Sequence, residues 1–383
     1  MTKQLHVLNL ANKQLPDHDY RVQYRSLSQL ARLTYGLPDK PDSLDADEFV
    51  KLGFREGLGI ADLMHFWGLG KHLVKNRKYD LVHCFSTKLQ LLGPLVAKIA
   101  GVSSVSTITG FGRTFNRDEL RYRLLRPFYM ALLRRSVASA KAVFFQNHGD
   151  LQWLERQLPK QAHKMHWIGS GVEAEVITGK NFEVSRLVVL MVARLMHDKG
   201  IQEYLEAASR LAGDQYRFLL VGPPSVGQES LYRQVQLAHE RGVVEYLGEM
   251  NQQELCEQYR RSHIFAFPSH GEGMPRVMLE AGHGLLCPVA SDIPAHRDLI
   301  KPGAGFLIER KQDFESLVAR LRDLQADRTL LKQNACAYQQ HILTNYTMTA
   351  YAKRMDGFLQ QLCPERLPTP PGRAAQFSAN EAA

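Results

Sequence analysis

The stretch IFAFPSHGEGMPRVMLEAG, residues 264–282, decides the fold of this chain. Its first six residues are aromatic and apolar, which is typical of a strand buried on both faces of a parallel sheet. A turn with two glycines follows, and Pro275 suits the first turn of a helix that runs on through Ala281. Glu272 and Gly273 are therefore predicted in a loop at a helix N-terminus, where free backbone N–H groups bind anions.

Two carboxylates bracket the start of this predicted helix. Glu272 is placed to accept hydrogen bonds from hydroxyl groups beside a bound phosphate, and glycine at 273 lets a ligand approach the backbone. Glu280 lies about two turns further on and could reach a vicinal diol such as a ribose. The competing interpretation is a capping acid followed by an ordinary surface glutamate, and local features do not decide between them.

Short apolar segments recur through the chain and alternate with longer helical patterns. The first series is 5–10, 79–85, 104–109, 142–146 and 164–168, and the second is 186–195, 216–222, 243–248, 264–269, 287–291 and 305–308. Two such series predict an α/β protein with two Rossmann-like, doubly wound domains that face a central cleft. Ligands bind at the carboxyl ends of such strands, so residues just after strands should carry the chemistry.

Glycines and polar residues interrupt the apolar pattern over 168–186, which places the domain boundary there. The predicted parts are one Rossmann-like domain over 1–172, a second over 173–346, a helix over 347–363 that packs back towards the first domain, and a disordered tail over 364–383. The segment 39–52 is weakly patterned and is predicted to be a loop. The region before Asp80 is short, and a strand or two usual in such a domain is hard to find there.

Composition excludes several classes of protein. The 383 residues are 44% hydrophobic and 23% charged, as in soluble globular proteins. No apolar run approaches the roughly 18 residues of a spanning helix, and the start of the chain lacks the apolar stretch of a secretory signal. The five scattered cysteines show no C-x-x-C spacing, which indicates neither a zinc site nor a disulfide framework. We expect a protein of the reducing cytoplasm.

Two cations follow another predicted strand, in VARLMHDKGI at 192–201. Arg194 and Lys199 lie in a loop after that strand, and Gly200 opens the next helix. Such a pair can clamp a diphosphate, the arginine as a planar fork and the lysine as a point charge. The competing interpretation is two solvated cations near a helix start. Gly222 ends the next strand tightly.

In their order, IGSGVE, VARLMHDKG, LLVGPP, VEYLGE and FAFPSHGEGMPRVMLEA closely resemble the retaining glycosyltransferases of family 4, which have the GT-B fold. The E-x7-E element of that family is here Glu272 and Glu280. In the amino-terminal half, YDLVHCFSTKLQLLGPLVAKIAGV, STITGFGRTF and VFFQNHGDL resemble the branch that extends bacterial surface polysaccharides on polyprenyl diphosphate carriers. The resemblance covers roughly residues 1–363.

The resemblance implies that 1–172 is the acceptor-binding domain and 173–346 the nucleotide-sugar-binding domain, with roles on both sides of the cleft. Arg194 and Lys199 would bind the donor diphosphate, and Glu272 would hold hydroxyl groups of the transferred sugar; these three are the expected catalytic residues. The full donor set is Arg194, Lys199, Gly222, Glu272, Gly273, Met274 and Glu280, in which Gly273 and Met274 offer backbone N–H groups and Glu280 holds the ribose. The acceptor side is Gly110, Phe111, Gly112, Arg113 and His83.

The resemblance also implies the reaction. The donor would be a nucleotide-diphosphate sugar, with UDP favoured, and the acceptor a polyprenyl-diphosphate or other lipid-linked glycan of O-antigen, capsule or lipopolysaccharide synthesis. Transfer of a hexose or N-acetylhexosamine would occur with retention and without a metal or other cofactor, because a helix dipole and cations stabilise the leaving diphosphate. No enzymic nucleophile is found, so front-side attack by the acceptor hydroxyl, assisted by the leaving phosphate, is expected.

Several positions depart from the family pattern. The first strand is followed by LNLANKQLPDHDYR, which lacks the usual glycine-rich loop. Thr109 replaces a histidine found in many relatives, and Ala295 and Asp298 stand where relatives often have Gly and Glu. Two alternatives therefore stay open: a catalytically silent GT-B protein that binds a nucleotide or a partner, and a nucleotide-sugar 2-epimerase. The E-x7-E spacing argues against the epimerase.

Residues 113–141 hold eight basic and two acidic side chains, in a chain whose net charge is +9. Apolar residues at helical spacing alternate with the arginines, and Pro127 is expected to kink the helix. A core helix with a solvated basic face and docking on the anionic inner leaflet of the cell membrane both fit, at about 1 kcal/mol for each basic residue near the lipid. The membrane-facing set would be Arg117, Arg121, Arg123, Arg126, Phe128, Arg134 and Arg135. Nucleic-acid binding is disfavoured because no such motif accompanies the charge.

His83 and Asn147 are weaker candidates that also follow predicted strands. A histidine at the end of a strand is more often packed in the core than catalytic, and that interpretation competes with an acceptor contact by His83. Asn147 is expected at the same edge of the cleft.

Overall fold

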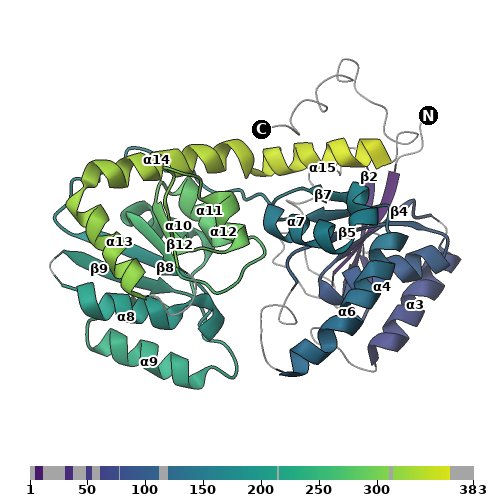
Figure 1. The fold of residues 1–383 in the computed structure, drawn as a ribbon, viewed down its shortest axis with the longest axis horizontal. Helices are drawn as coiled ribbons and strands as arrows, with labels where there is room; N and C mark the ends of the chain where they lie inside the picture. The colour runs from purple at the N-terminus through teal and green to yellow at the C-terminus, as the bar shows by residue number, and fades with distance from the viewer. Residues whose placement is uncertain are drawn as a thin grey trace, which may run out of the picture.

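The computed structural model describes residues 5–11, 31–37, 49–53, 61–76, 78–111, 120–213, 215–309 and 314–362. These residues form two α/β domains that lie next to each other, each built on one parallel sheet (Figure 1). The prediction of two doubly wound domains is therefore confirmed. The tail predicted to be disordered, 364–383, lies outside the described residues.

The amino-terminal sheet has seven parallel strands in the order β3-β2-β1-β4-β5-β6-β7. Its strands are β1 (Leu5–Leu10), β2 (Ala31–Leu37), β3 (Phe49–Lys51), β4 (Leu81–Phe85), β5 (Ser103–Ile108), β6 (Ala142–Phe145) and β7 (Met165–Trp167). Its helices are α3 (Ala61–Lys75), α4 (Thr87–Ile99), α6 (Leu120–Ser139), α7 (His148–Gln157) and the 3-10 helix η2 (Pro159–Lys164). The order reverses between β1 and β4, which opens a crevice at the carboxyl ends of these strands.

The carboxyl-terminal sheet has six parallel strands in the order β10-β9-β8-β11-β12-β13. Its strands are β8 (Leu187–Val192), β9 (Tyr216–Val221), β10 (Glu245–Tyr246), β11 (Ile264–Phe267), β12 (Cys287–Ser291) and β13 (Phe306–Ile308). Its helices are η3 (His197–Lys199), α8 (Ile201–Leu211), α9 (Glu229–Glu240), α10 (Gln252–Arg261), α11 (Arg276–His283), α12 (Pro294–Leu299), α13 (Phe314–Ala326) and α14 (Arg328–Asn345). The order reverses here too, between β8 and β11.

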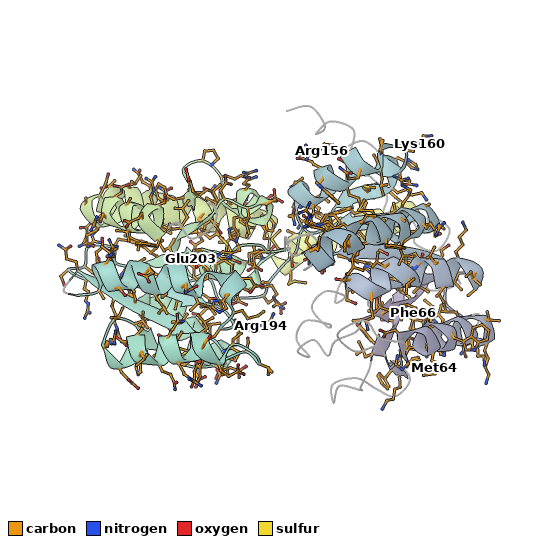
Figure 2. The ribbon with its side chains drawn as sticks, turned by 60° about the horizontal axis from the view of Figure 1, so that its bottom comes forward. Met64, Phe66, Arg156, Lys160, Arg194 and Glu203 are labelled. Carbon is orange, nitrogen blue, oxygen red and sulfur yellow. The ribbon has the colours of Figure 1, made fainter. Side chains whose placement is uncertain are left out.

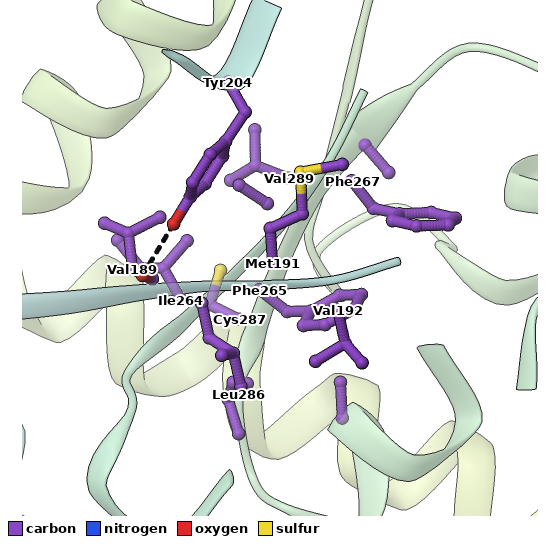
Figure 3. Packing of buried hydrophobic residues seen from close by; sticks show 14 of the residues in the cluster. Val189, Met191, Val192, Tyr204, Ile264, Phe265, Phe267, Leu286, Cys287 and Val289 are labelled. Carbon is purple, nitrogen blue, oxygen red and sulfur yellow. Dashed lines mark hydrogen bonds between the residues drawn. The ribbon is translucent and has the colours of Figure 1, made fainter. Parts of the chain in front are cut away.

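The core of the carboxyl-terminal domain is the apolar sandwich between this sheet and its helices (Figure 3). Strand residues such as Met191, Phe265 and Val289 are fully buried, as the nearly unbroken apolar runs predict. Tyr204 of α8 is also fully buried, and its hydroxyl lies 2.9 Å from the carbonyl oxygen of Val189 and 2.8 Å from that of Leu219. This helix is therefore joined to two neighbouring strands by polar contacts inside an apolar core.

All eleven predicted strands are present, with bounds that differ by up to three residues at either end. Sequence reasoning missed two strands, β2 and β3. Strand β2 pairs with β1, and β3 pairs with β2 at the edge of the sheet. The prediction of a loop over 39–52 is wrong at Phe49–Lys51, because these three residues pair with β2. Three half-exposed residues at a sheet edge carry too little apolar pattern to be recognised as a strand.

Two chain crossings join the domains. The first runs from β7 to β8 and contains the predicted boundary, and the second joins α14 to the last helix, α15 (Met348–Leu362). The two crossings touch where Val172 forms a bridge with Thr347. Beyond it, α15 packs on the amino-terminal sheet through Met348, Tyr351, Met355 and Leu359 (Figure 1). The last helix of the chain therefore belongs to the core of the first domain.

We predict that Tyr204→Phe lowers the free energy of unfolding by about 1–2 kcal/mol, because two buried strand carbonyls lose their shared donor. Urea denaturation of both proteins measures the difference. Tyr232→Phe is the matched control, since the Tyr232 hydroxyl has no hydrogen-bond partner among the described residues. Equal losses in the two variants would contradict the role given to the Tyr204 hydroxyl.

Candidate donor and acceptor site between the domains

The centre of the candidate site is an ion pair between two predicted catalytic residues. Lys199 Nζ lies 2.6 Å from Glu272 Oε1, and the Ser269 hydroxyl also donates to that oxygen at 2.6 Å. The two side chains are largely buried, with 19% and 11% of their surface exposed. The loops after β8 and β11 thus converge, because the two strands are neighbours in the sheet. Ser269 was not predicted.

Backbone conformation accounts for this convergence. Gly200 has φ of 75°, and a Cβ atom there would lie 2.1 Å from the carbonyl oxygen of Pro268. Only glycine therefore allows the loop after β8 to pass this close to the loop after β11. Two further bonds join the loops, from His270 N and Ser269 Oγ to the carbonyl oxygen of Asp198.

Arg194 and Gly222 lie in neighbouring loops of the same sheet edge. Arg194 is exposed, has no ion-pair partner among the described residues, and lies on the side of its domain that faces the amino-terminal domain (Figure 2). Gly222 has φ of 143°, and a Cβ there would lie 1.9 Å from the carbonyl oxygen of Ala193. The glycine thus fixes the path of the backbone just before Arg194. The exposed guanidinium is a candidate contact for an anion.

Gly273 and Met274 precede α11. This helix begins at Arg276, and no side chain caps its first N–H groups. Pro275 is the N-cap residue, one position before the first turn predicted for it. Met274 packs against the carboxyl-terminal core and so anchors the loop. The free N–H groups of the helix start are therefore available to an anion beside Glu272.

Glu280 is not an ordinary surface glutamate. Only 8% of the residue is exposed, and its carboxylate accepts a hydrogen bond of 3.0 Å from the Tyr259 hydroxyl. Burial raises the pKa of Glu280, while the Tyr259 bond and the charge of Arg276 lower it. Glu280 lines a cavity of about 920 Å³ between α10, α11 and the first domain crossing. It is a buried carboxylate at a cavity wall, a position that permits a contact with a diol.

The amino-terminal domain touches the loop after β11 directly. A Cβ atom on Gly273 would lie 1.7 Å from the carbonyl oxygen of Thr109, and one on Gly110 would lie 3.5 Å from the Cα atom of Gly273. The buried Asn147 side chain adds a hydrogen bond, donating from Nδ2 to the carbonyl oxygen of Gly273 at 2.9 Å. The loops that carry the acceptor and donor predictions therefore meet at Gly273.

Asn147 has two tasks that sequence reasoning did not separate. Its Oδ1 accepts from the Asp150 N–H and caps α7, while its Nδ2 reaches both Gly273 and the Asp150 carboxylate. An asparagine directly before a helix predicts the cap. The interdomain bond spans 126 positions and has no local signal.

Phe111 and Glu272 share a cavity of about 580 Å³ between α7 and α12. Phe111 is buried, and its ring lies 4.5 Å from that of Trp153, centroid to centroid. At the same interface Asp298 accepts hydrogen bonds from the His148 backbone and ring. The cavity thus joins a predicted acceptor residue to a predicted catalytic one. Gly112 and Arg113 lie outside the described residues.

His83 does not face a ligand space. It is 2% exposed in the middle of β4, its ring nitrogen lies 2.7 Å from the Thr107 hydroxyl, and it packs against Phe85 and Phe144. Burial lowers the pKa of His83 to about 3. The prediction of an acceptor contact is therefore wrong, and the competing interpretation of a packed core histidine holds.

Residues 120–139 of the basic segment form one continuous helix, α6, which contains Pro127. Its last half is anchored by the buried Leu133 and Val137, but the apolar residues of its first half are exposed, as listed here: Leu120, Leu124, Leu125 and Phe128. Arg123, Arg134 and Arg135 are exposed and Arg126 is half-buried. Core packing therefore does not explain the apolar stripe of the first half. Arg117 and the Arg121 side chain are not described.

Residues 174–340, which include Arg194, Lys199, Glu272 and Glu280, match the family of group 1 glycosyl transferases. The chain carries a group 1 glycosyl transferase domain. The transferase domain corresponds closely to the carboxyl-terminal sheet and its helices. Among the described residues, no three His, Cys, Asp or Glu side chains group closely enough to hold a metal ion.

Two bacterial enzymes are similar over most of their length. One is the N,N'-diacetylbacillosaminyl-diphospho-undecaprenol alpha-1,3-N-acetylgalactosaminyltransferase of Campylobacter jejuni, 25% identical over 76% of this chain and 81% of that enzyme. The other is the UDP-Gal:alpha-D-GlcNAc-diphosphoundecaprenol alpha-1,3-galactosyltransferase of Escherichia coli, 28% identical over 71% of this chain and 72% of that enzyme. The similarity thus extends beyond the transferase domain into the amino-terminal half.

Solved structures share the fold of the whole chain. Sucrose-phosphate synthase from Thermosynechococcus elongatus superposes with a TM-score of 0.78 at 16% identity, covering 94% of this chain and 100% of that one. Anabaena HepE, solved in complex with UDP, superposes with a TM-score of 0.75 at 14% identity and the same coverage. These likenesses establish the GT-B fold.

We predict that Asn147→Ser lowers the free energy of unfolding by about 1–2 kcal/mol, because serine keeps the cap of α7 but cannot donate to Gly273. The matched control is Asn251→Ser, since Asn251 caps α10 in the same way and makes no bond between domains. Chemical denaturation of the two variants isolates the interdomain bond. Equal losses would show that capping alone explains Asn147.

We predict a pH-dependent effect of Asp150→Asn. Burial raises the pKa of Asp150 to about 6, opposed by the hydrogen bond from Asn147. The folded protein therefore binds this proton more tightly than the unfolded chain, and the resulting stability, present at acid pH, is lost as pH rises through about 6.

Asparagine keeps the acceptor oxygen and cannot ionise. The variant should exceed the wild type in unfolding free energy by about 1–3 kcal/mol near pH 7.5 and match it near pH 4. Thermal melts at both pH values measure the gap. Glu249→Gln, at an exposed carboxylate, is the control, and a gap for Asp150→Asn that does not change with pH would contradict the prediction.

Proposed function

We propose that this protein is a retaining glycosyltransferase that transfers a hexose or N-acetylhexosamine from a UDP-sugar to a lipid-linked glycan in the synthesis of a bacterial surface polysaccharide. The observation that carries the proposal is the Lys199–Glu272 pair, in a transferase domain, beside the uncapped start of α11 and against the Thr109–Gly110 loop of the other domain. A cation, a carboxylate and free N–H groups meet there.

The donor diphosphate has a matching set of groups in this arrangement. The Lys199 ammonium has three donors, so it can hold Glu272 and a phosphate oxygen together. The exposed Arg194 guanidinium can add a two-pronged contact, and the N–H groups of Gly273 and Met274 lie at the positive end of α11. Glu272 would then accept hydrogen bonds from the sugar, while Glu280 would hold the ribose from the wall of its cavity.

The proposed reaction needs no enzymic nucleophile. The acceptor oxygen forms a bond to the anomeric carbon as the bond from that carbon to the leaving phosphate oxygen breaks, on the same face of the sugar. The proton of the acceptor hydroxyl passes to the leaving phosphate oxygen, so charge and atoms balance. Arg194, Lys199 and the start of α11 stabilise the negative charge that develops on the diphosphate. We propose that this stabilisation replaces a metal ion.

The acceptor assignment draws on the relatives. The two named enzymes act, by their names, on diphospho-undecaprenol-linked sugars, and one takes UDP-Gal. Support within this chain comes from the cavity that joins Phe111 to Glu272, because an acceptor glycan there would lie beside the transferred sugar. A lipid-linked acceptor lies at a membrane, so we propose a peripheral position on the inner leaflet, with the exposed arginines of α6 near anionic headgroups.

We predict that one nucleotide diphosphate raises the melting temperature of the wild type and that Arg194→Ala abolishes the shift. A ligand at one hundred times its Kd adds about 2.7 kcal/mol to the free energy of unfolding. The measurement compares UDP, GDP, ADP and their sugars in thermal melts. Arg241→Ala, at an exposed arginine outside the site, is the control and should keep the full shift.

Transfer is then measured with labelled donor and lipid-diphosphate glycans, with NMR of the product's anomeric configuration and with a chelator present. Glu272→Ala should lose most of the transfer, and turnover equal to wild type in this variant would contradict the proposed role of Glu272. Donor binding with neither hydrolysis nor transfer would favour a silent nucleotide-binding protein. Conversion of the free donor to its epimer would favour the epimerase.

A further inference from the structure

An exposed apolar face covers three helices of the amino-terminal domain. Helix α4 packs against both α3 and α6, so the three form one continuous layer on the sheet (Figure 1). Of the eleven exposed large apolar side chains of the described residues, eight lie on these helices: Met64, Trp67, Val74, Ile99, Leu120, Leu124, Leu125 and Phe128. Such clustering marks an interaction surface, since single exposed apolar residues are normally scattered.

The half of this face that sequence reasoning missed is a groove of about 630 Å³ between α3 and α4. Its lining is apolar except for two lysines, as listed: Phe66, Trp67, Gly70, Lys71, Val74, Lys75, Val96, Ile99 and Ala100. Trp67 is 68% exposed and Ile99 is 86% exposed at its two sides. Figure 2 shows Met64 on α3 pointing away from the protein. We call the residues that line this cavity the α3–α4 groove.

The charged side chains that line the groove are both lysines. Lys71, Lys75 and Lys98 lie on α3 and α4, and Lys71 Nζ is 5.3 Å from the centroid of the Trp67 ring. The one acidic residue of α3, α4 and α6 is Asp62, which is buried and paired with Lys88 at 2.7 Å. Lysines that flank apolar side chains can place their ammonium groups at lipid phosphates while the apolar groups enter the acyl chains.

We propose that the α3–α4 groove docks on a bilayer that contains anionic phospholipid, with Trp67 and Ile99 among the acyl chains and Lys71 and Lys75 at the phosphates. The proposal extends the membrane position in the proposed function but depends on neither donor nor acceptor. The described residues include no helix with the length and apolar character of a membrane span. A second copy of this chain is a poorer occupant, because a symmetric contact would bring the lysines of both copies together.

Vesicle flotation tests the proposal with the full chain. The wild type should bind vesicles of phosphatidylethanolamine and phosphatidylglycerol. Its affinity for them should fall as the salt concentration is raised. Lys71→Gln with Lys75→Gln should lower the affinity about 30-fold, from about fivefold for each lysine near the anionic surface. Trp67→Ser with Ile99→Ser should lower it about tenfold or more, because two inserted apolar groups are lost. The controls, Lys332→Gln and Leu237→Ser, lie on exposed sites of the other domain and should bind like wild type.

Fluorescence gives a second readout that a change in folding cannot mimic. Trp67 emission should shift to shorter wavelength on vesicle binding and be quenched by brominated acyl chains, and Trp67→Phe should remove that signal. Wild-type affinity in the Trp67→Ser, Ile99→Ser variant, or an unchanged Trp67 signal on bound vesicles, overturns the proposal. A wild-type dimer in vesicle-free solution also overturns it, if the Trp67→Ser, Ile99→Ser variant is a monomer under the same conditions. The melting shift with nucleotide should stay intact in every variant, which separates a failure of the groove from a failure of the proposed function.

Discussion

The close approach of two backbones at Gly273 is the constraint on which the rest of the site depends. A Cβ atom there would collide with the Thr109 carbonyl, so only glycine lets the loop after β11 approach the amino-terminal domain this closely. Asn147 then bonds to the carbonyl of the same glycine, and the Lys199–Glu272 pair lies directly beside it. Other contacts, such as His148 with Asp298 and α15 with the first sheet, also join the domains, and the contact at Gly273 sets how closely these two loops approach.

Both sheets place the loops that make this contact in the same way. Parallel strands end at one edge, so loops far apart in the chain gather there, and the reversal of strand order leaves room between them. Lys199 and Glu272 are 73 positions apart and meet because β8 and β11 are neighbours. Glycines at 200, 222 and 273 set how closely the loops pass. The chemistry is held by backbone geometry as much as by side-chain identity.

Patterns along the chain therefore predict the fold well. Continuous apolar segments identify eleven of the thirteen strands in the described residues, and two residues chosen for their positions after strands, Lys199 and Glu272, lie in contact, while their roles stay predictions. Edge strands such as β3 escape, because a short half-exposed segment has no distinct periodicity. His83 was predicted to follow a strand but lies in the middle of β4, and the pattern along the chain does not show that its ring turns into the core. Contacts between domains, such as Asn147 with Gly273, and the α3–α4 groove require the assembled surface.

The last helix has a consequence for how the chain is made. Because α15 supplies Met348, Tyr351, Met355 and Leu359 to the core of the first sheet, that sheet leaves the ribosome with part of its apolar surface bare. Synthesis at about 5–20 residues per second means that the whole transferase domain is translated before the cover arrives. The first domain therefore completes its core only after the transferase domain has been made, and a premature stop within α15 would leave part of the first sheet uncovered.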